Sequence, residues 1–411
     1  MTVLIWVKTF PAISETFVRD HVVGLIDSGF DVLIHTKDGQ FNEDAFKALE
    51  GLDTYHLDTC IVDVDAYYEP QRFKRYVKGV GVFFNGLLSP QRKAYFNALN
   101  VFKFKAEAWS LRLLFRVHFI VRKKVSIIHA HFGDNGVMAS SIKATGLDIR
   151  LYTTFHGYDI RLGIAKGGGV YKRLFAAADG IVSISNYNKQ HLLDFGLAAS
   201  KVIDLPNGID TEAFKRPRPN VLDGTTIRLL SVARLVPEKA LHIALEAVAL
   251  VQAQLPDYIL EYTLIGEGPE RKALEDLVVR LGISSQVRFL GSQSSIVVQE
   301  AMKTHHVFLL SSKVEALPTV LLEAQAAGLV IVATDVGSVS TVVKSGAVVS
   351  KYSVDAFSNA LLKLIDENTL WVEDSKKGQD YVADYYDVHQ QINALIDLYK
   401  LNLYESSIKK R

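Results

Sequence analysis

Cysteine and long hydrophobic runs are both scarce in this sequence of 411 residues. Its single cysteine, Cys60, excludes an internal disulfide framework and suits a reducing compartment. The longer apolar runs, such as residues 79–88, fall well short of the roughly 20 residues that a membrane-spanning helix needs. The strand-like TVLIWV follows Met1 without a basic leader or a cleavage site. We therefore expect a cytoplasmic protein, at most peripheral on the inner face of the cytoplasmic membrane.

A surplus of charge of one sign is missing too. The chain carries 46 Lys and Arg against 45 Asp and Glu, a net charge of +1, so its overall charge indicates no nucleic-acid partner. No Gly-x-Gly-x-x-Gly motif follows the first expected strand, which disfavours a dinucleotide oxidoreductase. No repeat of solenoid length stands out. The 49% apolar composition suits sizeable cores in two or three ordinary domains.

Short β-branched runs alternate with helical patterns along the chain, which predicts a parallel α/β fold. A second series of such runs begins near Ile227, which favours two doubly wound, Rossmann-like domains over a single barrel. The first series of expected strands is TVLIWV, DVLIHT, VSIIHAHF, RLYTTFHG, GIVSIS and KVIDLP, and the second is IRLLSVA, LEYTLIG, VRFLG, VFLLSS and VIVATD. Between them, residues 207–226 have turn-forming residues and no periodicity, as is typical of a linker.

These patterns predict an N-terminal domain over residues 1–206, a C-terminal domain over residues 207–384 and a helical tail over residues 385–411 that packs back on the N-terminal domain. Open parallel sheets bind ligands at the carboxyl ends of their strands. Two such domains facing each other would form a cleft between them. The loops at the strand ends are therefore where we expect the chemistry.

The loop after IRLLSVA places two cations five residues apart. Arg234 would lie at the strand end and Lys239 in the first turn of a helix expected over Lys239–Gln254. A cation in a first helical turn opposes the helix dipole, so the placement is best explained if both residues hold a phosphate group. An exposed Arg and Lys on a surface loop would show the same spacing.

The stretch SSKVEALPTVLLEAQAAG, residues 311–328, places Glu315 and Glu323 eight residues apart. Pro318 suits the first turn of a helix over roughly Thr319–Gly328, because its missing N–H would be unpaired there. The free N–H groups at the start of this helix would form an anion site. The two glutamates would then reach hydroxyl groups on either side of a bound phosphate. A solvated Glu315 and a Glu323 that favours the helix dipole are the alternative.

The motifs ARLVPEK, LIGEGPER, VRFLG and EALPTVLLEAQAAG, followed by VIVATDVGS, resemble in order and spacing those of the family 4 retaining nucleotide-sugar glycosyltransferases. This family has the GT-B architecture of two Rossmann-like domains. The resemblance covers most of Asn207–Val349, and the spacing of Glu315 and Glu323 is its most specific part. FPAISETFVRDHV, IIHAHFG and TFHGYD are similar to the subgroup that builds exopolysaccharides such as colanic acid.

The resemblance implies a hexosyltransferase whose acceptor is a lipid-linked saccharide. Arg234 and Lys239 would hold the donor diphosphate, and Glu315 would bind the transferred sugar. Glu323 would bind the ribose, and His156 would face the sugar from the first domain. The backbone of the intervening segment would contact sugar and phosphate through Ala316, Leu317, Pro318 and Thr319.

The family needs no metal and no cofactor beyond a nucleotide-sugar co-substrate, here UDP- or GDP-linked, and no Asp-x-Asp is placed to hold a metal. The chain departs from the family pattern at Ala240, where glycine is usual, and at residues 338–341, where Ser-Val-Ser-Thr replaces a Gly and a Pro-Glu pair. A nucleotide-sugar epimerase of the same fold and a catalytically inactive subunit of a polysaccharide assembly are the alternatives. An inactive subunit would be expected to lose Glu315, Lys239 or Arg234.

In the first half of the chain, His129 and His131 share one face of an expected strand. A metal site there is one alternative, but a structural or acceptor-facing role is commoner, so we predict no metal site. Ser14 can cap a helix that begins near Glu15. The candidates for acceptor binding are therefore Ser14, Glu15 and His131.

Residues 71–124 form a basic segment with a single acid, Glu107. Interleaved aromatic residues give it the composition of a contact with an anionic membrane surface. Nucleic acid is the rival, but no groove-reading motif accompanies it, and a solvated helical face is the plainer alternative. The basic residues are Arg72, Lys74, Arg75, Lys78, Arg92, Lys93, Lys103, Lys105, Arg112, Arg116, Arg122, Lys123 and Lys124.

Overall fold

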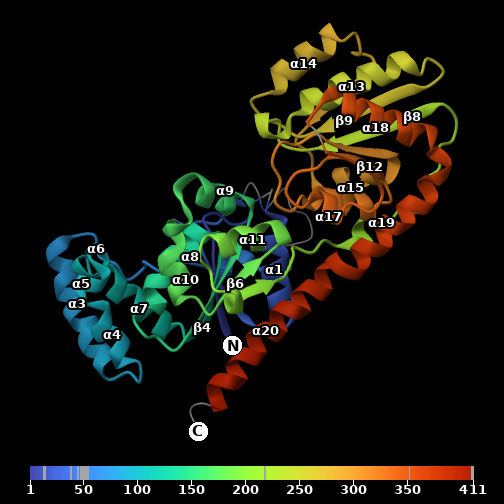
Figure 1. Cartoon of the computed structure of the whole chain (residues 1–411). Helices are drawn as coiled ribbons and strands as arrows, with labels where there is room; N and C mark the ends of the chain where they lie inside the picture. Colours follow the sequence, from blue (N-terminus) through green and yellow to red (C-terminus); the bar gives the residue numbers. More distant parts are fainter. Residues whose placement is uncertain are drawn as a thin grey trace. The chain divides into compact units, whose positions relative to one another are not determined.

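The computed structural model describes residues 1–12, 15–37, 39–43, 46, 55–216, 219–350 and 352–408, with the backbone alone for 402–408. The chain divides into two compact units, one made of Met1–Leu205 with Ile392–Arg411 and the other of Pro206–Gln391 (Figure 1). Each unit is an α/β layer structure around its own parallel sheet. The predicted fold class, GT-B with two doubly wound Rossmann-like units, is confirmed.

The sheet of the first unit has the strand order β3-β2-β1-β4-β5-β6-β7, and all of its pairings are parallel. Its strands are β1 (Thr2–Trp6), β2 (Asp31–His35), β3 (Ile61–Val62), β4 (Val125–His131), β5 (Arg150–Phe155), β6 (Gly180–Ser183) and β7 (Val202–Asp204).

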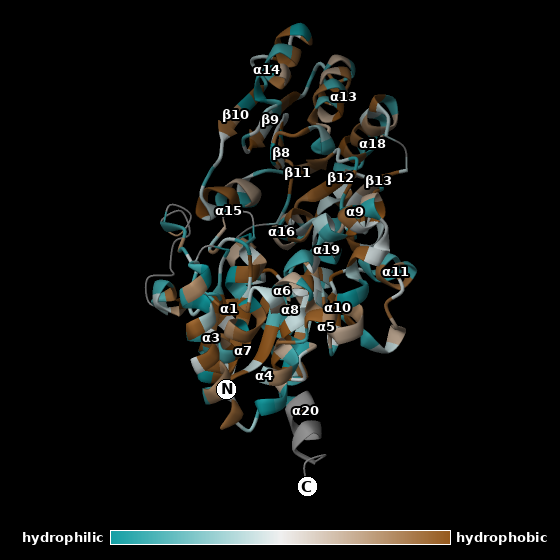
Figure 2. Cartoon of the chain, turned by 90° about the vertical axis from the view of Figure 1, so that its left-hand side faces the viewer, coloured by the Kyte–Doolittle hydropathy of each residue, from teal (hydrophilic) through white to brown (hydrophobic). Residues whose placement is uncertain are grey.

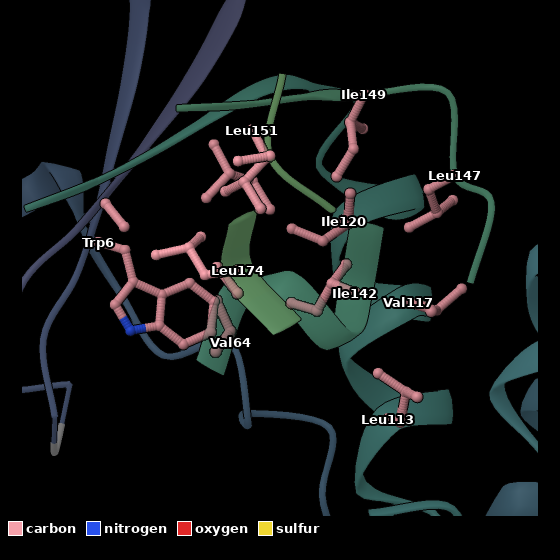
Figure 3. Packing of buried hydrophobic residues seen from close by; sticks show 14 of the residues in the cluster. Trp6, Val64, Leu113, Val117, Ile120, Ile142, Leu147, Ile149, Leu151 and Leu174 are labelled. Atoms are coloured by element: carbon pink, nitrogen blue, oxygen red, sulfur yellow. The ribbon is translucent and has the colours of Figure 1, made fainter. Parts of the chain in front are cut away.

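Helices cover both faces of this sheet, which is why its central strands β1, β4 and β5 are buried along most of their length. Successive side chains of a strand point to opposite faces. In β1, Leu4 and Trp6 therefore enter one core, whereas Val3 and Ile5 enter the other. Figure 3 shows the first of these cores, in which Trp6 lies beside Val64 and Leu174.

The helices of the first unit are α1 (Thr16–Asp27), α3 (Arg72–Leu87), α4 (Arg92–Ala98), α5 (Val101–Phe104), α6 (Ala106–Trp109), α7 (Arg112–Arg122), α8 (Gly133–Lys143), α9 (Gly157–Lys166), α10 (Lys172–Ala177), α11 (Asn186–Asp194) and most of α20 (Val388–Ile408). Residues of α1 and α20 cover one face of the sheet, and α7, α8 and α10 cover the other. The helices α3–α6 form an additional layer that packs on α7 (Figure 1).

The second unit repeats the same plan with the strand order β10-β9-β8-β11-β12-β13, again parallel throughout. Its strands are β8 (Thr226–Val232), β9 (Ile259–Ile265), β10 (Val287–Gly291), β11 (Val307–Leu310), β12 (Val330–Thr334) and β13 (Gly346–Val349). Its helices are α12 (Thr211–Phe214), α13 (Leu241–Gln254), α14 (Arg271–Arg280), α15 (Ser295–Thr304), α16 (Thr319–Ala326), α17 (Val339–Val342), α18 (Val354–Asp366) and α19 (Trp371–Tyr386).

Both sheets reverse their winding at one point, between β1 and β4 in the first unit and between β8 and β11 in the second. At such a point the loops that leave the two strands diverge, and a crevice forms outside the carboxyl ends of the strands. The loops that follow β8 and β11 are those that carry Arg234, Lys239 and Glu315.

Two details differ from the expectations. Residues 207–226 are not featureless, because Asp210 caps the short helix α12 by accepting a hydrogen bond from the Ala213 N–H at 3.0 Å. The second unit also extends to Gln391 rather than ending at residue 384, since α19 and the first turn of α20 belong to it. The backbone of Ile209 pairs with Asp387 and joins the two ends of this unit.

Candidate active site

The loops after β8 and β11 lie side by side in the second unit. The N–H of Lys313 donates to the carbonyl of Glu238 at 2.8 Å, and the Ser311 hydroxyl donates to the carbonyl of Lys239 at 3.2 Å. Two loops distant in sequence are thus joined by one backbone and one side-chain hydrogen bond at the point where the sheet reverses its winding. This arrangement brings together Lys239 and Glu315, two of the side chains that the sequence predicted to act on a donor.

Lys239 and Glu315 form an ion pair across these loops. The Lys239 Nζ lies 2.6 Å from the Glu315 Oε1, and the two side chains are 20% and 10% exposed. A charge-assisted hydrogen bond in such a partly buried place is stronger than a surface ion pair. An anionic ligand that contacts Lys239 would therefore share this lysine with Glu315.

The helix α16 begins at Thr319, four residues after Glu315. This start is as predicted, and Pro318 is the N-cap, with φ of −75°, one residue before the first turn. Within the described part of the chain, the N–H groups of Thr319 and Val320 have no acceptor. These groups and the helix dipole make a place where a phosphate can bind.

The same helix ends where the sequence predicted a stop. Gly328 follows it with φ of +74°, and its N–H donates to the carbonyl of Gln325 at 2.9 Å. Glu323 lies in the second turn and is half-buried. Ala316 and Leu317 are each 8% exposed, so a ligand would meet mainly the backbone of this segment.

A support for the Glu315 loop that the sequence analysis missed comes from the loop after β12. Gly337 has φ of +59°, and a Cβ placed on it would lie 1.9 Å from the carbonyl oxygen of Glu315. The neighbouring Ser338 hydroxyl donates to the carbonyl of Ala316. The sequence signal for this contact was Gly337 itself, a glycine three residues after the end of the apolar strand β12.

The loop after β8 differs from the expectation in its local structure. Lys239 lies in a 3₁₀ turn, Pro237–Lys239, and α13 begins only at Leu241. Ala240 separates the two with a left-handed backbone, φ of +48°. This conformation accounts for the glycine that the family pattern has there, since glycine adopts it without strain. Arg234 is exposed and forms no ion pair within the described residues.

In the first unit, buried histidines form a hydrogen-bonded chain that we call the histidine chain: Thr154, His129, Tyr399, His21, His131 and His156. The Tyr399 hydroxyl of α20 lies 2.6 Å from the Nδ1 of His129 and 3.2 Å from the Nε2 of His21. The Nδ1 of His21 lies 2.9 Å from the Nε2 of His131, whose Nδ1 lies 3.3 Å from the Nε2 of His156. At the other end, the Nε2 of His129 lies 2.7 Å from the Thr154 hydroxyl.

Burial keeps these imidazoles neutral. It lowers the pKa of His131 to about 3 and the pKa of His21, His129 and His156 well below the ordinary value of 6.5. Each neutral imidazole offers one N–H and one lone pair, so on each side of Tyr399 the hydrogen bonds all run in one direction, and the Tyr399 hydroxyl can donate to one neighbouring imidazole or accept from both. The Nδ1 of His156 is buried without a partner among the described residues.

Three histidines of the histidine chain are close enough together to be considered as metal ligands. Nitrogens of His21, His129 and His131 lie within 4.8 Å of one another, and neutral imidazoles are the form that binds zinc. These nitrogens are already paired with each other or with Tyr399. A metal would have to displace those hydrogen bonds, so the residues fit a network better than a metal centre.

The acceptor candidates have different outcomes. Ser14 lies outside the described residues. Glu15 is the N-cap of α1, and partial burial raises its pKa. His131 is 4% exposed and uses both ring nitrogens within the histidine chain, so a direct contact with an acceptor stays a prediction and would require one of these bonds to break.

The loop that carries His156 is held by a buried carboxylate. Asp159 accepts hydrogen bonds from the N–H groups of His156 and Gly133, at 2.8 Å and 2.7 Å. Burial raises the pKa of Asp159 to about 7 in spite of these two donors. The His156 ring itself stacks on Phe17, with 4.3 Å between the ring centres. Backbone and ring are therefore both fixed.

Two family models match the chain. The model described as Glycosyltransferase Family 4 matches residues 14–213, and the model described as Glycosyl transferases group 1 matches residues 213–382. The putative colanic acid biosynthesis glycosyltransferase WcaL of Salmonella typhimurium is 28% identical over 390 residues, which cover 90% of this chain and 92% of that protein. The UDP-Gal:alpha-D-GlcNAc-diphosphoundecaprenol alpha-1,3-galactosyltransferase of Escherichia coli is 24% identical over 300 residues, 68% of this chain and 76% of that protein.

A solved structure shows the same fold over nearly the whole chain. Anabaena Alr3699/HepE in complex with UDP has a TM-score of 0.68 at 15% sequence identity, and the match covers 97% of this chain and 99% of that one. The family resemblance of the motifs is thereby confirmed. This chain belongs to the family 4 glycosyltransferases, has their GT-B fold, and is similar to members that serve exopolysaccharide biosynthesis.

Proposed function

We propose that this glycosyltransferase moves a hexose from a nucleotide-diphosphate sugar, UDP- or GDP-linked, to a lipid-linked saccharide with retention of configuration. The observation that carries the proposal is the Lys239–Glu315 ion pair beside the free N–H groups at the start of α16. A cation and a helix start favour a diphosphate, and a carboxylate beside them favours a sugar hydroxyl. Arg234, in the same loop as Lys239, is assigned to the diphosphate as well.

The assigned groups suit the charge that the reaction creates. When the bond between the sugar and the diphosphate breaks, negative charge grows on the leaving oxygen. Lys239, Arg234 and the N–H groups of α16 would stabilise it without a metal ion, because such donors are already oriented before the reaction. Glu315 would hold the transferred sugar, and Glu323 the ribose.

Retention follows from attack on the face that the leaving group departs from. The bond between the anomeric carbon and the phosphate oxygen breaks while the bond to the acceptor oxygen forms on the same face. The leaving phosphate takes the proton of the acceptor hydroxyl, so this step needs no separate base. His156 is assigned to the transferred sugar, as the family resemblance implies.

The relatives support the substrate classes. The Escherichia coli relative is named for transfer of galactose from UDP-Gal to a diphosphoundecaprenol-linked sugar, and the Anabaena structure holds UDP. An acceptor of this kind lies in a membrane, and we propose that the chain works on the cytoplasmic face of one. Residues 71–124 are the part of the chain that would contact an anionic membrane surface.

Donor hydrolysis tests the proposal directly. The purified chain would be incubated with UDP-, GDP-, ADP- and dTDP-sugars, and slow release of free sugar followed by mass spectrometry, with Glu315→Ala and Arg234→Ala in parallel. Hydrolysis of one donor, lost in both variants but kept in Arg280→Ala, is the expected result. Arg280 is an exposed cation of α14, outside the assigned site.

Other outcomes point elsewhere. An isomerised but uncleaved sugar would identify an epimerase, and neither turnover nor nucleotide binding across the panel would identify an inactive subunit. Hydrolysis that persists after prolonged treatment with a chelator is expected, and its loss with recovery on adding back a divalent cation would refute metal independence. The anomer released first, read by NMR, tests retention.

A further inference from the structure

The helix α3 carries an unusual apolar stripe on its outward face. Five side chains of this 16-residue helix and its C-cap are exposed although they are apolar: Phe73, Val77, Val80, Phe84 and Leu88. At 100° per residue they fall within roughly 80° of the helix circumference. Phe73 and Leu88 are 80% and 88% exposed, so the stripe is not a groove under another element.

The opposite face of α3 fixes this orientation. A Cβ placed on Gly79 would lie 2.6 Å from Leu111, and one placed on Gly86 would lie 2.2 Å from the ring of Tyr95. The helix therefore packs so closely on its neighbours that the glycine face cannot turn outward. Since that face is buried, the stripe must remain in contact with whatever surrounds the protein.

Further exposed aromatic residues lie on α4–α6, and two of them contact α3. The Tyr76 hydroxyl of α3 donates to the carbonyl of Trp109 at 3.1 Å, and the rings of Phe83 and Phe96 are 5.1 Å apart. Trp109 and Phe96 are themselves exposed, and Phe102 on α5 is 93% exposed. Figure 2 shows how hydrophobic and hydrophilic positions alternate along α3.

Cations flank the stripe, and acids are missing from it. Within the described residues, no hydrogen bond or ion pair engages the side chains of the exposed cations Arg72, Lys74, Arg92, Lys93 and Lys105. Over residues 71–124 thirteen basic residues stand against one acid, and of these thirteen Arg116 is buried in an ion pair with Asp65 while Arg112 lies 4.0 Å from the same carboxylate. Two copies of so basic a surface would repel each other, which disfavours a dimer through this face. An apolar stripe with a cationic border fits a layer of anionic lipid.

We infer that the α3 stripe, with Trp109 beside it, is an insertion face that lies in the surface of an anionic bilayer. At about 24 Å the helix is too short to cross one. Indeed, none of the helices in the described part of the chain combines the length and apolar composition that a membrane crossing requires. The stripe would enter the acyl boundary while Lys74 and Arg72 stay at the phosphates.

This inference deepens the membrane contact proposed above, but vesicle binding needs no sugar transfer, so either can fail without the other. Sedimentation would be compared on phosphatidylcholine vesicles with and without phosphatidylglycerol. The wild type is expected to bind the anionic vesicles at least about tenfold more tightly. Phe73→Ser with Phe84→Ser should lower that binding by about tenfold or more, because two buried phenyl rings are lost. Val279→Ser, an equally exposed apolar residue on α14, is the control.

Tryptophan emission gives a second measurement on the intact protein. Of the three tryptophans, Trp6 and Trp371 are 1% exposed, so a vesicle-induced blue shift would report Trp109. The shift should appear with anionic vesicles and vanish in Trp109→Phe. Unchanged vesicle binding by the Phe73→Ser, Phe84→Ser variant would overturn the inference. So would a wild-type dimer that this variant dissociates while vesicles bind neither protein.

Discussion

At the scale of single residues, Lys239 and Glu315 are placed to exchange partners. In the structure each satisfies the other at 2.6 Å. A donor that presents its diphosphate to Lys239 and a sugar hydroxyl to Glu315 would replace one charged contact by two. The ion pair thus keeps both side chains in position before the donor arrives, which is the preorganisation that charge stabilisation requires.

The variant Lys239→Ala is expected to lower kcat/KM for donor turnover by about 10²–10³-fold, because one donor to the leaving diphosphate is lost. The free energy of unfolding should fall by only about 1–2 kcal/mol, since Glu315 retains some access to water. Steady-state kinetics and urea unfolding measure the two effects. Lys272→Ala, which removes an exposed ion pair of α14, is the matched control and should change neither by much. A similar loss of turnover in both variants would refute the assignment.

Tyr399 tests the histidine chain from its middle. Tyr399→Phe leaves the Nδ1 of His129 and the Nε2 of His21 without their partner, and unpaired buried groups cost about 1–3 kcal/mol each. We expect the first unit to lose at least about 1 kcal/mol of unfolding free energy in urea. Tyr385→Phe removes the hydroxyl of an exposed tyrosine and serves as control. Equal free energies of unfolding for the two variants would contradict the hydrogen bonds of Tyr399 to His129 and His21.

At the scale of elements, the site is made by loops that support one another. The Glu315 loop is held by backbone contacts to the loop after β8, by Ser338 and by the close approach of Gly337. The loop after β8 is held in turn by the loop after β9, where a Cβ on Gly266 would lie 1.9 Å from the carbonyl of Ala233. Small residues at these places let the four loops after β8, β9, β11 and β12 pack within van der Waals distance.

Gly337→Ala is expected to lower both the stability and the UDP affinity, because it combines an unfavourable backbone conformation with a steric clash. An alanine at φ of +59° costs about 1–2 kcal/mol, and its Cβ would also clash with the Glu315 carbonyl. Gly282→Ala is the matched control, because Gly282 has φ of +71° with no atom close to a new Cβ. Thermal unfolding and UDP titration calorimetry should show a larger loss of stability, and weaker binding, only for Gly337→Ala. Equal effects would mean that the contact does not position the loop.

At the scale of the whole molecule, buried histidines set the dependence of stability on pH. The folded-state pKa of His21, His129, His131 and His156 lies below that of the unfolded chain. The unfolded state therefore binds more protons below about pH 6.5, and stability present above that pH is lost as the pH falls. Each of these histidines costs about 1.4 kcal/mol at one pH unit below its ordinary pKa.

Asp159 acts in the opposite direction. Its folded-state pKa of about 7 is raised, so its contribution to stability falls as the pH rises from about 4 to 7. On going from pH 7.5 to 5.5 it returns roughly 2 kcal/mol, which is less than the four histidines lose. The free energy of unfolding should therefore be lower at pH 5.5 by a few kcal/mol. In Asp159→Asn the free energy of unfolding should fall more steeply between pH 7.5 and 5.5 than in the wild type. A wild type that is equally or more stable at pH 5.5 would contradict the claim that the four histidines are buried in the neutral form.

The sequence by itself determined the two parallel sheets, because continuous β-branched runs such as TVLIWV and VIVATD are long enough to be recognised and can only be buried on both faces. The sequence analysis did not predict β3, whose two residues are too few for a periodic signal, or β13, Gly346–Val349, which begins with a glycine. It also identified the loops with Arg234, Lys239 and Glu315, since these follow strand ends. The 3₁₀ turn at Lys239 escaped it, because alanine at position 240 gives no sign of a left-handed backbone.

Only the tertiary structure decided which of these residues meet. Lys239 and Glu315 pair because β8 and β11 are neighbours in the sheet, an adjacency that arises from the reversal of the winding order. His129 and His131 share a strand face by sequence, but His21 and Tyr399 reach them from α1 and α20. Likewise, the composition of residues 71–124 is basic and aromatic, yet the packing of Gly79 and Gly86 determines that Phe73 and Phe84 of α3 face outward. Local pattern determines elements, whereas contacts between distant elements depend on the free energy of the whole packing arrangement.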